Sequence, residues 1–565
     1  MRKATLLTLA LSVSALFASA QSTTEAPSLK TFESGKVYSI KNVQQHKFAA
    51  AMPQTGDMAC SSTFNLACLF TITPVEGETS TYTIKPYADD TKVVYSIKVA
   101  NADNTVGIKA ADNAANTKWK IAEALDANYV TIISSNSTAT NGYWNHRGTN
   151  ADWNLSGIGG YTANSDNPGS FWTIAEVSNE DIATAKTNFV NFYSTIISSI
   201  SSDQISDKLG YYSQALIDEA KSKITNATDN KTVYKSAISL ANLVNLPVDG
   251  KAYKMYGLFS AVDGVRAKAY LKSNENDVFI MQKQADGRYK IVSSKADEQN
   301  LIYTGNGSQT GKKVSLFNIT VRSRIDFGAL NLVTAEDFTA NVCISKDGST
   351  LNQYSTGSDN KNWSTEWYFE EATDYAGHAV TFTASTDGKA YATLNLPFAT
   401  TIPAGVTAYK KVEDTSTSVK LEVYKNADEV LPANTPVLLQ ADAAGKKTFA
   451  PAAYESKVET GFSGTLAAAA VKDANAYILA KDGEAVKFCK LSTTNNTVNA
   501  NKAYFTLTAA AANALNFDFG GVTTGIENAV ADKANNAPIY DLSGRRVMNA
   551  VKGGIYIQNG KKFVK

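Results

Sequence analysis

Between residues 36 and 177, apolar and polar positions alternate in short runs broken by Asn, Asp, Gly and Ser, a pattern that predicts short strands. Three of these runs open alike: Tyr38-Ser39-Ile40, Thr81-Tyr82-Thr83-Ile84 and Tyr129-Val130-Thr131-Ile132. Three others, about 50 residues apart, close with an aromatic residue, a polar residue and Ile: Phe70-Thr71-Ile72, Trp119-Lys120-Ile121 and Trp172-Thr173-Ile174. We therefore expect a threefold repeat in which each unit buries its closing aromatic ring against the other two.

A threefold, aromatic-closed β-repeat over residues 36–177 resembles the ricin-type, lectin-like β-trefoils. The Gln-x-Trp motif of that family is absent, because positions 68, 117 and 170 hold Cys, Thr and Ser. The resemblance implies the fold more strongly than it implies the family's sugar site. Residues 250–373 open with Lys251-Ala252-Tyr253-Lys254-Met255 and close with Trp367-Tyr368-Phe369, which repeats the closing pattern. We expect a second trefoil-like module there.

The period changes between residues 178 and 246. Ser178-Asn179-Glu180-Asp181 is a capping-box-like helix start, and three runs of apolar residues then follow at helical spacing. They are Ile182, Phe189, Tyr193, Ile196, Ile197 and Ile200; Ala215, Leu216, Ala220 and Ile224; and Tyr234, Ile238, Leu240 and Leu243. We interpret this block as a small helical spacer that holds two β-modules apart.

Residues 375–522 return to strand character. The recurring phrases Ile402-Pro403-Ala404-Gly405, Leu431-Pro432-Ala433-Asn434 and Val498-Asn499-Ala500-Asn501 end in residues that tolerate a left-handed backbone. The block, including Tyr391 to Phe398, resembles a β-sandwich that precedes the C-terminal sorting tail in Bacteroidetes surface proteins. The expected fold class is thus mainly β: two β-trefoil-like modules separated by a helical spacer, then a β-sandwich and a short β-tail.

The two ends of the chain indicate export. Arg2 and Lys3 precede an apolar run from Leu6 to Phe17, and Ala18-Ser19-Ala20 is a small-x-small cleavage site, so residues 1–20 read as a secretory signal peptide. Residues 538–565 predict short strands with a Ser-Gly turn and an Asn-Gly hairpin turn. This end resembles the type IX sorting tail, which implies recognition by export machinery and a secreted or surface-attached protein; a plain terminal hairpin is the alternative.

The amino-acid composition argues against several classes of function. The 565 residues carry 54 Lys+Arg against 53 Asp+Glu, which argues against nucleic-acid binding and against a polybasic membrane-surface protein. No further apolar stretch approaches the ~18–20 residues of a membrane span. The chain has three histidines and lacks the Gly-x-Ser-x-Gly, His-Glu-x-x-His and phosphate-loop motifs, so we predict neither catalysis nor a cofactor or metal. Cys60 and Cys68 could close a small loop, and Cys343 and Cys489 are expected to be buried thiols.

The densest candidate site combines aromatic, amide and charged side chains in one short stretch. It comprises Tyr143, Trp144, Asn145, His146, Arg147, Asp152, Trp153 and Asn154. An indole face covers the apolar side of a sugar ring, while amides, carboxylates and a guanidinium bind its hydroxyls. The alternative is that both tryptophans fill the core and the polar residues hold turns. A weaker candidate site of the same kind lies in the second module and comprises Asn360, Lys361, Asn362 and Trp363.

The sequence therefore predicts a secreted or cell-surface, non-catalytic protein that binds polysaccharide or glycoprotein glycans through two lectin-like modules. Two alternatives stay open. One is a structural or adhesive surface protein that contacts host or envelope proteins. The other is a glycoside hydrolase with an unrecognised active site, since sequence alone cannot show two carboxylates facing one another across a cleft.

Overall fold

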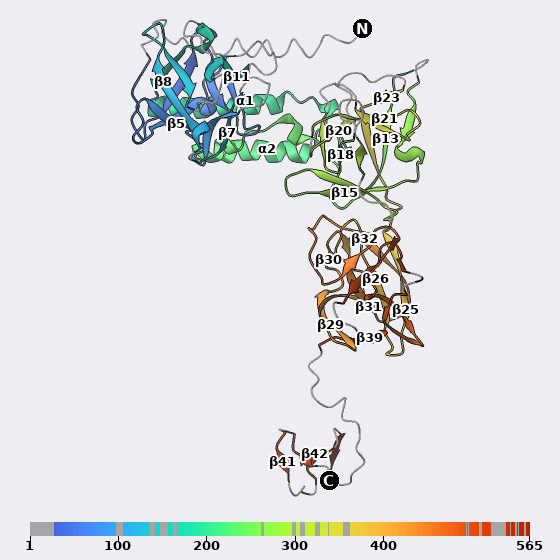
Figure 1. The fold of residues 1–565 in the computed structure, drawn as a ribbon. Coiled ribbons are helices and arrows are strands. Elements are labelled where there is room, and N and C mark those ends of the chain that lie inside the picture. The colour runs from blue at the N-terminus through green and yellow to red at the C-terminus, as the bar shows by residue number, and fades with distance from the viewer. Residues whose placement is uncertain are drawn as a thin grey trace. The chain divides into compact units, whose positions relative to one another are not determined.

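A computed structural model places most of the chain in two compact units, residues 1–245 and 246–565, which are described separately (Figure 1). The described residues are 28–97, 105–112, 114–135, 142–146, 156–161, 167–261, 265–296, 301–304, 311–321, 328–336, 338–353, 362–492, 494, 496–507, 511–520, 538–542, 544–547, 551, 553–558 and 561–564. The predicted signal peptide lies outside them.

Six strands of the first unit form a closed antiparallel ring. They are β1 (Tyr38–Asn42), β4 (Leu69–Pro74), β5 (Thr81–Pro86), β8 (Lys118–Glu123), β9 (Val130–Ser134) and β12 (Trp172–Glu176). Each pairs with the next in this order, and β12 pairs back with β1, which closes the ring. Closure leaves no free sheet edge in the ring.

Three hairpins complete this first module. They are β2 (Phe48–Ala51) with β3 (Met58–Ser61), β6 (Lys92–Ile97) with β7 (Thr105–Ala110), and β10 (Tyr143–His146) with β11 (Ser156–Tyr161). Strand β11 also pairs with β3 and β7, so the hairpins meet one another. A short 3₁₀ turn precedes the last strand of each unit: η1 (Leu66–Cys68), η2 (Ala115–Thr117) and η3 (Pro168–Ser170). The same arrangement of two ring strands, one hairpin and one 3₁₀ turn thus occurs three times along this module, which is a trefoil-like connectivity.

The closing aromatic residues seal the centre of the module. Phe70, Trp119 and Trp172 are all fully buried in one core cluster. The indole N–H of Trp119 donates to the Val94 carbonyl at 3.0 Å, and that of Trp172 donates to the Trp144 carbonyl at 3.0 Å. Each tryptophan thereby joins the last strand of its unit to its own hairpin, and the three closing rings share one buried cluster in which Trp144 contacts both Trp119 and Trp172.

The helical block is part of the first unit rather than a free-standing spacer. Helix α1 (Asn179–Ser198) begins at Ser178, whose hydroxyl accepts from the Asp181 amide, and α2 (Gln214–Asn226) and α3 (Asn230–Lys235) follow. The third predicted helix ends at Lys235, and a separate 3₁₀ turn, η5 (Leu240–Leu243), follows after four residues. The apolar stripe of α1 packs on the outside of the first module, where Tyr234 also donates to the Ala51 carbonyl at 2.7 Å. An amphipathic helix must bury its apolar face against another element. The spacer interpretation named no element for this contact.

The second unit begins with another closed ring of six antiparallel strands. They are β13 (Ala252–Leu258), β15 (Phe279–Lys283), β16 (Tyr289–Ser293), β19 (Phe317–Val321), β20 (Leu330–Thr334) and β24 (Trp367–Glu371). Between them lie β14 (Lys268–Tyr270), with η6 (Leu271–Ser273), β17 (Tyr303–Thr304), β18 (Lys313–Val314), β21 (Val342–Ser345), β22 (Leu351–Gln353) and β23 (Trp363–Ser364). Trp367 donates to the Val342 carbonyl at 2.8 Å, the same bond that the closing tryptophans of the first module make.

The third module differs from a two-layer sandwich. One path of thirteen hydrogen-bonded strands runs through it, and its central strands β26 (Ala390–Leu394) and β31 (Val437–Ala441), with the first residues of β28 (Val406–Asp414), place buried side chains in two separate core clusters, giving three layers. The other strands on this path are β25 (His378–Ala384), β27 (Thr400–Thr401), β29 (Ser418–Lys425), β30 (Val430–Leu431), β32 (Gly445–Pro451), β33 (Ser463–Gly464), β35 (Ala476–Asp482), β36 (Ala485–Lys490), β38 (Ala503–Thr506) and β39 (Ala514–Asp518). Strands β34 (Ala469–Ala470) and β37 (Thr497–Val498) form a separate pair.

The second and third modules share one hydrophobic core. Buried Gln282 of β15 donates to the Ala452 carbonyl at 3.1 Å and accepts from the Ala399 amide at 2.8 Å. Gly250 has a φ of +76°, and a Cβ there would lie 2.3 Å from the Ala452 carbonyl carbon. The second and third modules, expected at residues 250–373 and 375–522, are therefore packed against each other.

The C-terminal segment forms a small four-stranded sheet in the order β41-β40-β42-β43. Its strands are β40 (Ile539–Tyr540), β41 (Arg546–Val547), β42 (Ile555–Gln558) and β43 (Lys561–Val564). Gly544 has a φ of +79° in the turn between β40 and β41, as a Ser-Gly turn requires. The two expected hairpins are present; Asn559 and Gly560, at the second turn, lie outside the described residues.

Candidate functional site

The stretch predicted as the sugar site falls partly within the described chain. Tyr143, Trp144, Asn145 and His146 form strand β10 of the first module. Arg147, Asp152, Trp153 and Asn154 lie outside the described residues, so their part in a site stays a prediction.

Trp144 belongs to the core. Its side chain is 0% exposed and makes edge-to-face contacts with Trp119 and Trp172, at centroid distances of 5.4 and 5.9 Å. The ring cannot stack on a sugar from this position, which corrects the expectation that it faces a ligand. The physical reason is register: along a strand alternate side chains face opposite sides, and on β10 the core side falls to Trp144.

Asn145 and His146 are also buried, and the described contacts of Asn145 are structural. Asn145 donates to the Ser170 hydroxyl at 2.9 Å and so ties β10 to the turn η3. On the other side of that turn, Asn42 donates to the Gly169 carbonyl at 2.9 Å. Burial, and then the positive charge of Lys47, lower the pKa of His146, which therefore stays neutral at pH 7. Tyr143 alone of the four is half-buried, with part of its surface open to solvent.

Three half-buried tyrosines lie on the outside of the second ring. Tyr270 of β14, Tyr256 of β13 and Tyr368 of β24 stand opposite one another across three adjacent antiparallel strands. Their inward neighbours Met255, Ala269, Trp367 and Phe369 are buried, whereas the three tyrosines are half-buried and face outward. We call this set the tyrosine row.

The rings of the tyrosine row contact one another directly. Tyr256 stacks on Tyr368 with 5.2 Å between centroids and 10° between planes, and it lies 5.5 Å from Tyr270 at 58°. Partial burial raises the pKa of Tyr256, so its hydroxyl is a neutral donor and acceptor at pH 7. The row thus combines half-buried aromatic side chains with hydroxyl groups, a mixture of groups that sugar-binding surfaces use.

Charged groups border the row. The Lys268 ammonium lies 3.7 Å from the Tyr256 ring centroid and 4.4 Å from that of Tyr270, and it pairs with Glu370 at 2.8 Å. Burial lowers the pKa of Lys268, but hydrogen bonds to Glu370 and Tyr270 outweigh it, and the net shift is upward. The Tyr270 hydroxyl donates to Glu370 at 3.3 Å. These groups hold the rings in place and also offer a cation and a carboxylate to ligand hydroxyls.

A second ion pair anchors the other end of the row. Arg266 pairs with the buried carboxylate of Glu366 and donates to the Leu258 carbonyl at 3.2 Å. The Tyr368 hydroxyl donates to the same carboxylate at 3.3 Å. Arg266 and the Tyr368 hydroxyl thus donate to the same Glu366 carboxylate, which ties the Tyr368 side chain to this ion pair.

Sequence reasoning did not find the tyrosine row. Alternation alone places Tyr256 and Tyr368 outward, because Met255 and Trp367 next to them face inward. Their adjacency depends on the pairing of β13 with β24, more than 100 residues apart in the chain. In the weaker candidate site predicted at residues 360–363, Asn360 and Lys361 lie outside the described residues.

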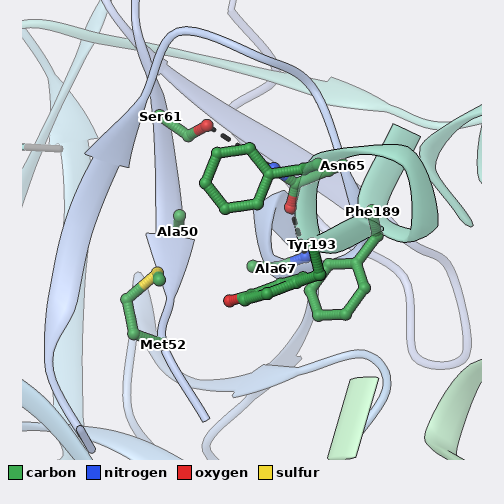
Figure 2. A pocket seen from close by; sticks show the side chains of 8 residues that line it. Ala50, Met52, Ser61, Asn65, Ala67, Phe189 and Tyr193 are labelled. Atoms are coloured by element: carbon green, nitrogen blue, oxygen red, sulfur yellow. Dashed lines mark hydrogen bonds between the residues drawn. The ribbon is translucent and has the colours of Figure 1, made fainter. Parts of the chain in front are cut away.

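The gap between the first module and α1 is a packing feature (Figure 2). It is lined by Ala50, Met52, Ser61, Asn65, Ala67, Phe189, Phe192 and Tyr193. The Asn65 side chain accepts from the Ala67 amide at 2.9 Å, and Gln54 donates to the Tyr193 hydroxyl at 2.9 Å. Its polar groups thus serve the η1 turn and the helix contact.

The described residues show neither a metal cluster nor a membrane helix. Nowhere in the described part of the chain do three His, Cys, Asp or Glu side chains gather as metal ligands would. Among the described helices none is long and apolar enough to cross a bilayer. Cys60 and Cys68 are free, buried thiols whose pKa burial raises to about 12; Cys343 is buried as expected, but Cys489 is half-buried.

Comparisons with known proteins leave the family open. No protein-family model and no curated protein matches the chain. Among solved structures, it is similar to the designed threefold-symmetric protein ThreeFoil (10% identity, TM-score 0.22, covering 25% of this chain and 99% of that one). It is also similar to an apo form of the BEL β-trefoil (18%, 0.22, 26% and 99%) and to SeviL bound to the asialo-GM1 saccharide (12%, 0.20, 25% and 98%). These TM-scores lie below 0.5, so the trefoil assignment rests on the strand pairing.

Proposed function

We propose that this chain is an exported, non-catalytic protein that binds glycans, and that the tyrosine row of the second module is a sugar-contacting surface. The observation that carries the proposal is the outward alignment of Tyr270, Tyr256 and Tyr368 beside Lys268 and Glu370. Such a surface costs little conformational entropy on binding, because the rings are already packed against one another.

The first module has a different part in the proposal. With Trp144 in the core, we propose that ligand contact in the first module falls to the sequence-predicted Trp153, Arg147, Asp152 and Asn154, which lie outside the described residues. Single sugar sites are weak, and a second linked site would raise the apparent affinity if the ligand spans both. The export part of the proposal is supported by the signal-peptide pattern and by the two C-terminal hairpins, which export machinery would recognise.

A glycan array with the full mature chain tests binding first. Titration of the best ligand against Tyr256→Ala and Tyr368→Ala then tests the surface, with an expected loss of about tenfold or more in affinity for each. Tyr95→Ala is the matched control, because Tyr95 is a half-buried strand tyrosine of the first module that lies under Lys109 at 5.2 Å.

The outcomes separate the alternatives. Binding that survives both row substitutions but is lost in Trp153→Ala would move the site to the first module. A chain that binds no glycan but captures host or envelope proteins would favour the adhesive alternative. Release of reducing sugar from mixed polysaccharides would favour the hydrolase.

A further inference from the structure

The C-terminal sheet exposes one amphipathic face. Residues that stand opposite one another in the strand register share this face, which we call the outer face: Arg546, Tyr540, Ile557, Lys562, Ile555 and Val564. Three of its apolar side chains are among the most exposed large hydrophobic residues of the described chain, with Tyr540 at 37%, Ile555 at 41% and Val564 at 67%. A small sheet normally needs cover on its hydrophobic face.

The opposite face holds what little core the sheet has. Tyr556 is buried there, its hydroxyl accepts from the Val551 amide at 2.9 Å, and its ring lies 6.0 Å from Phe563. Among the described residues, the buried contacts of the sheet therefore lie on the Tyr556 side, and Tyr540, Ile555 and Val564 of the outer face remain exposed.

Charge is concentrated in the same segment. Residues 538–565 contain six cationic residues and a single acidic one, Asp541, although the whole chain is almost neutral. Asp541 pairs with Arg545 at 3.1 Å. On the outer face, Arg546 pairs across the strands with Tyr540, Tyr540 with Ile557, and Ile557 with Lys562. The exposed cations Arg546 and Lys562 therefore stand at the two ends of this cross-strand line. A second copy of this sheet would be repelled, and a neutral apolar partner would leave the cations unpaired.

We propose that the outer face of the C-terminal sheet docks on an anionic lipid surface. The apolar side chains of Tyr540, Ile555 and Val564 would enter the interface, and Arg546 and Lys562 would pair with anionic headgroups. The inference is independent of glycan binding, because it uses a different module and different residues.

Co-sedimentation of the full chain with vesicles tests the proposal. We expect binding to phosphatidylcholine vesicles that contain phosphatidylglycerol, a much weaker affinity for pure phosphatidylcholine, and a fall in binding as salt rises. The double variant Arg546→Glu/Lys562→Glu should lose about tenfold or more. The control Lys120→Glu/Lys446→Glu makes the same change in net charge at exposed strand positions of other modules and should bind as the unmodified chain does.

The apolar contribution has its own matched pair. Val564→Ser should weaken binding, whereas Val423→Ser, at a 52% exposed strand valine of the third module, should not. The proposal is overturned if the unmodified chain ignores anionic vesicles, binds neutral ones equally, or binds equally after the Arg546/Lys562 reversal. Binding to immobilised polyglutamate but not to anionic vesicles would assign the face to an acidic protein instead. The salt series on the unmodified chain decides the matter even if a variant misfolds.

Discussion

Replacing Trp172 by Phe and Trp144 by Phe makes the same chemical change in the same core, but the first also breaks a hydrogen bond. Both side chains are 0% exposed and touch each other. The Trp172 indole N–H donates to the Trp144 carbonyl, whereas none of the described residues accepts from the Trp144 indole N–H.

The two variants should therefore differ in stability. Lost packing costs about 1–2 kcal/mol in each. Trp172→Phe also leaves a buried carbonyl without its indole donor, which costs about 1–3 kcal/mol more. Trp144→Phe instead removes an unpaired buried donor and regains about 1 kcal/mol. We expect Trp172→Phe to be the less stable variant by about 2 kcal/mol or more, and Trp119→Phe to resemble it because Trp119 donates to the Val94 carbonyl.

Thiol labelling in urea, read by peptide mass, measures this within the full chain. Cys60 and Cys68 are fully buried in the first unit, and burial raises the pKa of both to about 12, so they react only after that unit opens. A difference of about 2 kcal/mol corresponds to roughly 30-fold in labelling rate. Equal rates for the Trp172 and Trp144 variants, or faster labelling in Trp144→Phe, would refute the assigned hydrogen bond.

Two further predictions concern a packed junction and a buried histidine. Gly250→Ala should destabilise the second unit by several kcal/mol, because the added Cβ would collide with backbone of the third module. The control Gly287→Ala, at a φ of +86° with open space around it, should cost about 1 kcal/mol. Thiol labelling of the second unit compares the two variants, and similar losses of stability would contradict the packed junction. Burial, and then Lys47, lower the pKa of His146 in the folded chain, so the unfolded chain takes up the proton first as the pH falls. The stability that neutral His146 gives the first unit is therefore present above pH 6.5 and is lost as the pH falls below it. Thermal unfolding at pH 7.5 and 5.0 should show a smaller acid loss in His146→Gln, and an unchanged loss would contradict the role of that group.

The threefold plan could be predicted because its signal is local. Phe70, Trp119 and Trp172 recur at nearly even spacing with the same apolar partner two residues on, and the ring closes where those residues lie. The second ring followed from the same closing pattern at Trp367.

The site was harder to predict because it depends on register and pairing. A shift of one residue moves every side chain to the other face of a strand, so composition alone could not tell that Trp144 faces inward. The tyrosine row needs the closure of the second ring, which brings β13 beside β24. The third layer had a weak signal in Ala390–Leu394, where Thr393 is the one residue that is neither aliphatic nor aromatic, since strands buried on both faces lack a regular polar alternation.

Hydrogen–deuterium exchange of the full chain, with and without the best glycan from the array, tests the central claim most directly. The account predicts slowed exchange in Ala252–Leu258, Lys268–Tyr270 and Trp367–Glu371, with little change elsewhere in the second unit. Slowed exchange confined to residues 143–154, or to the third module, would contradict the tyrosine row as the glycan-binding surface.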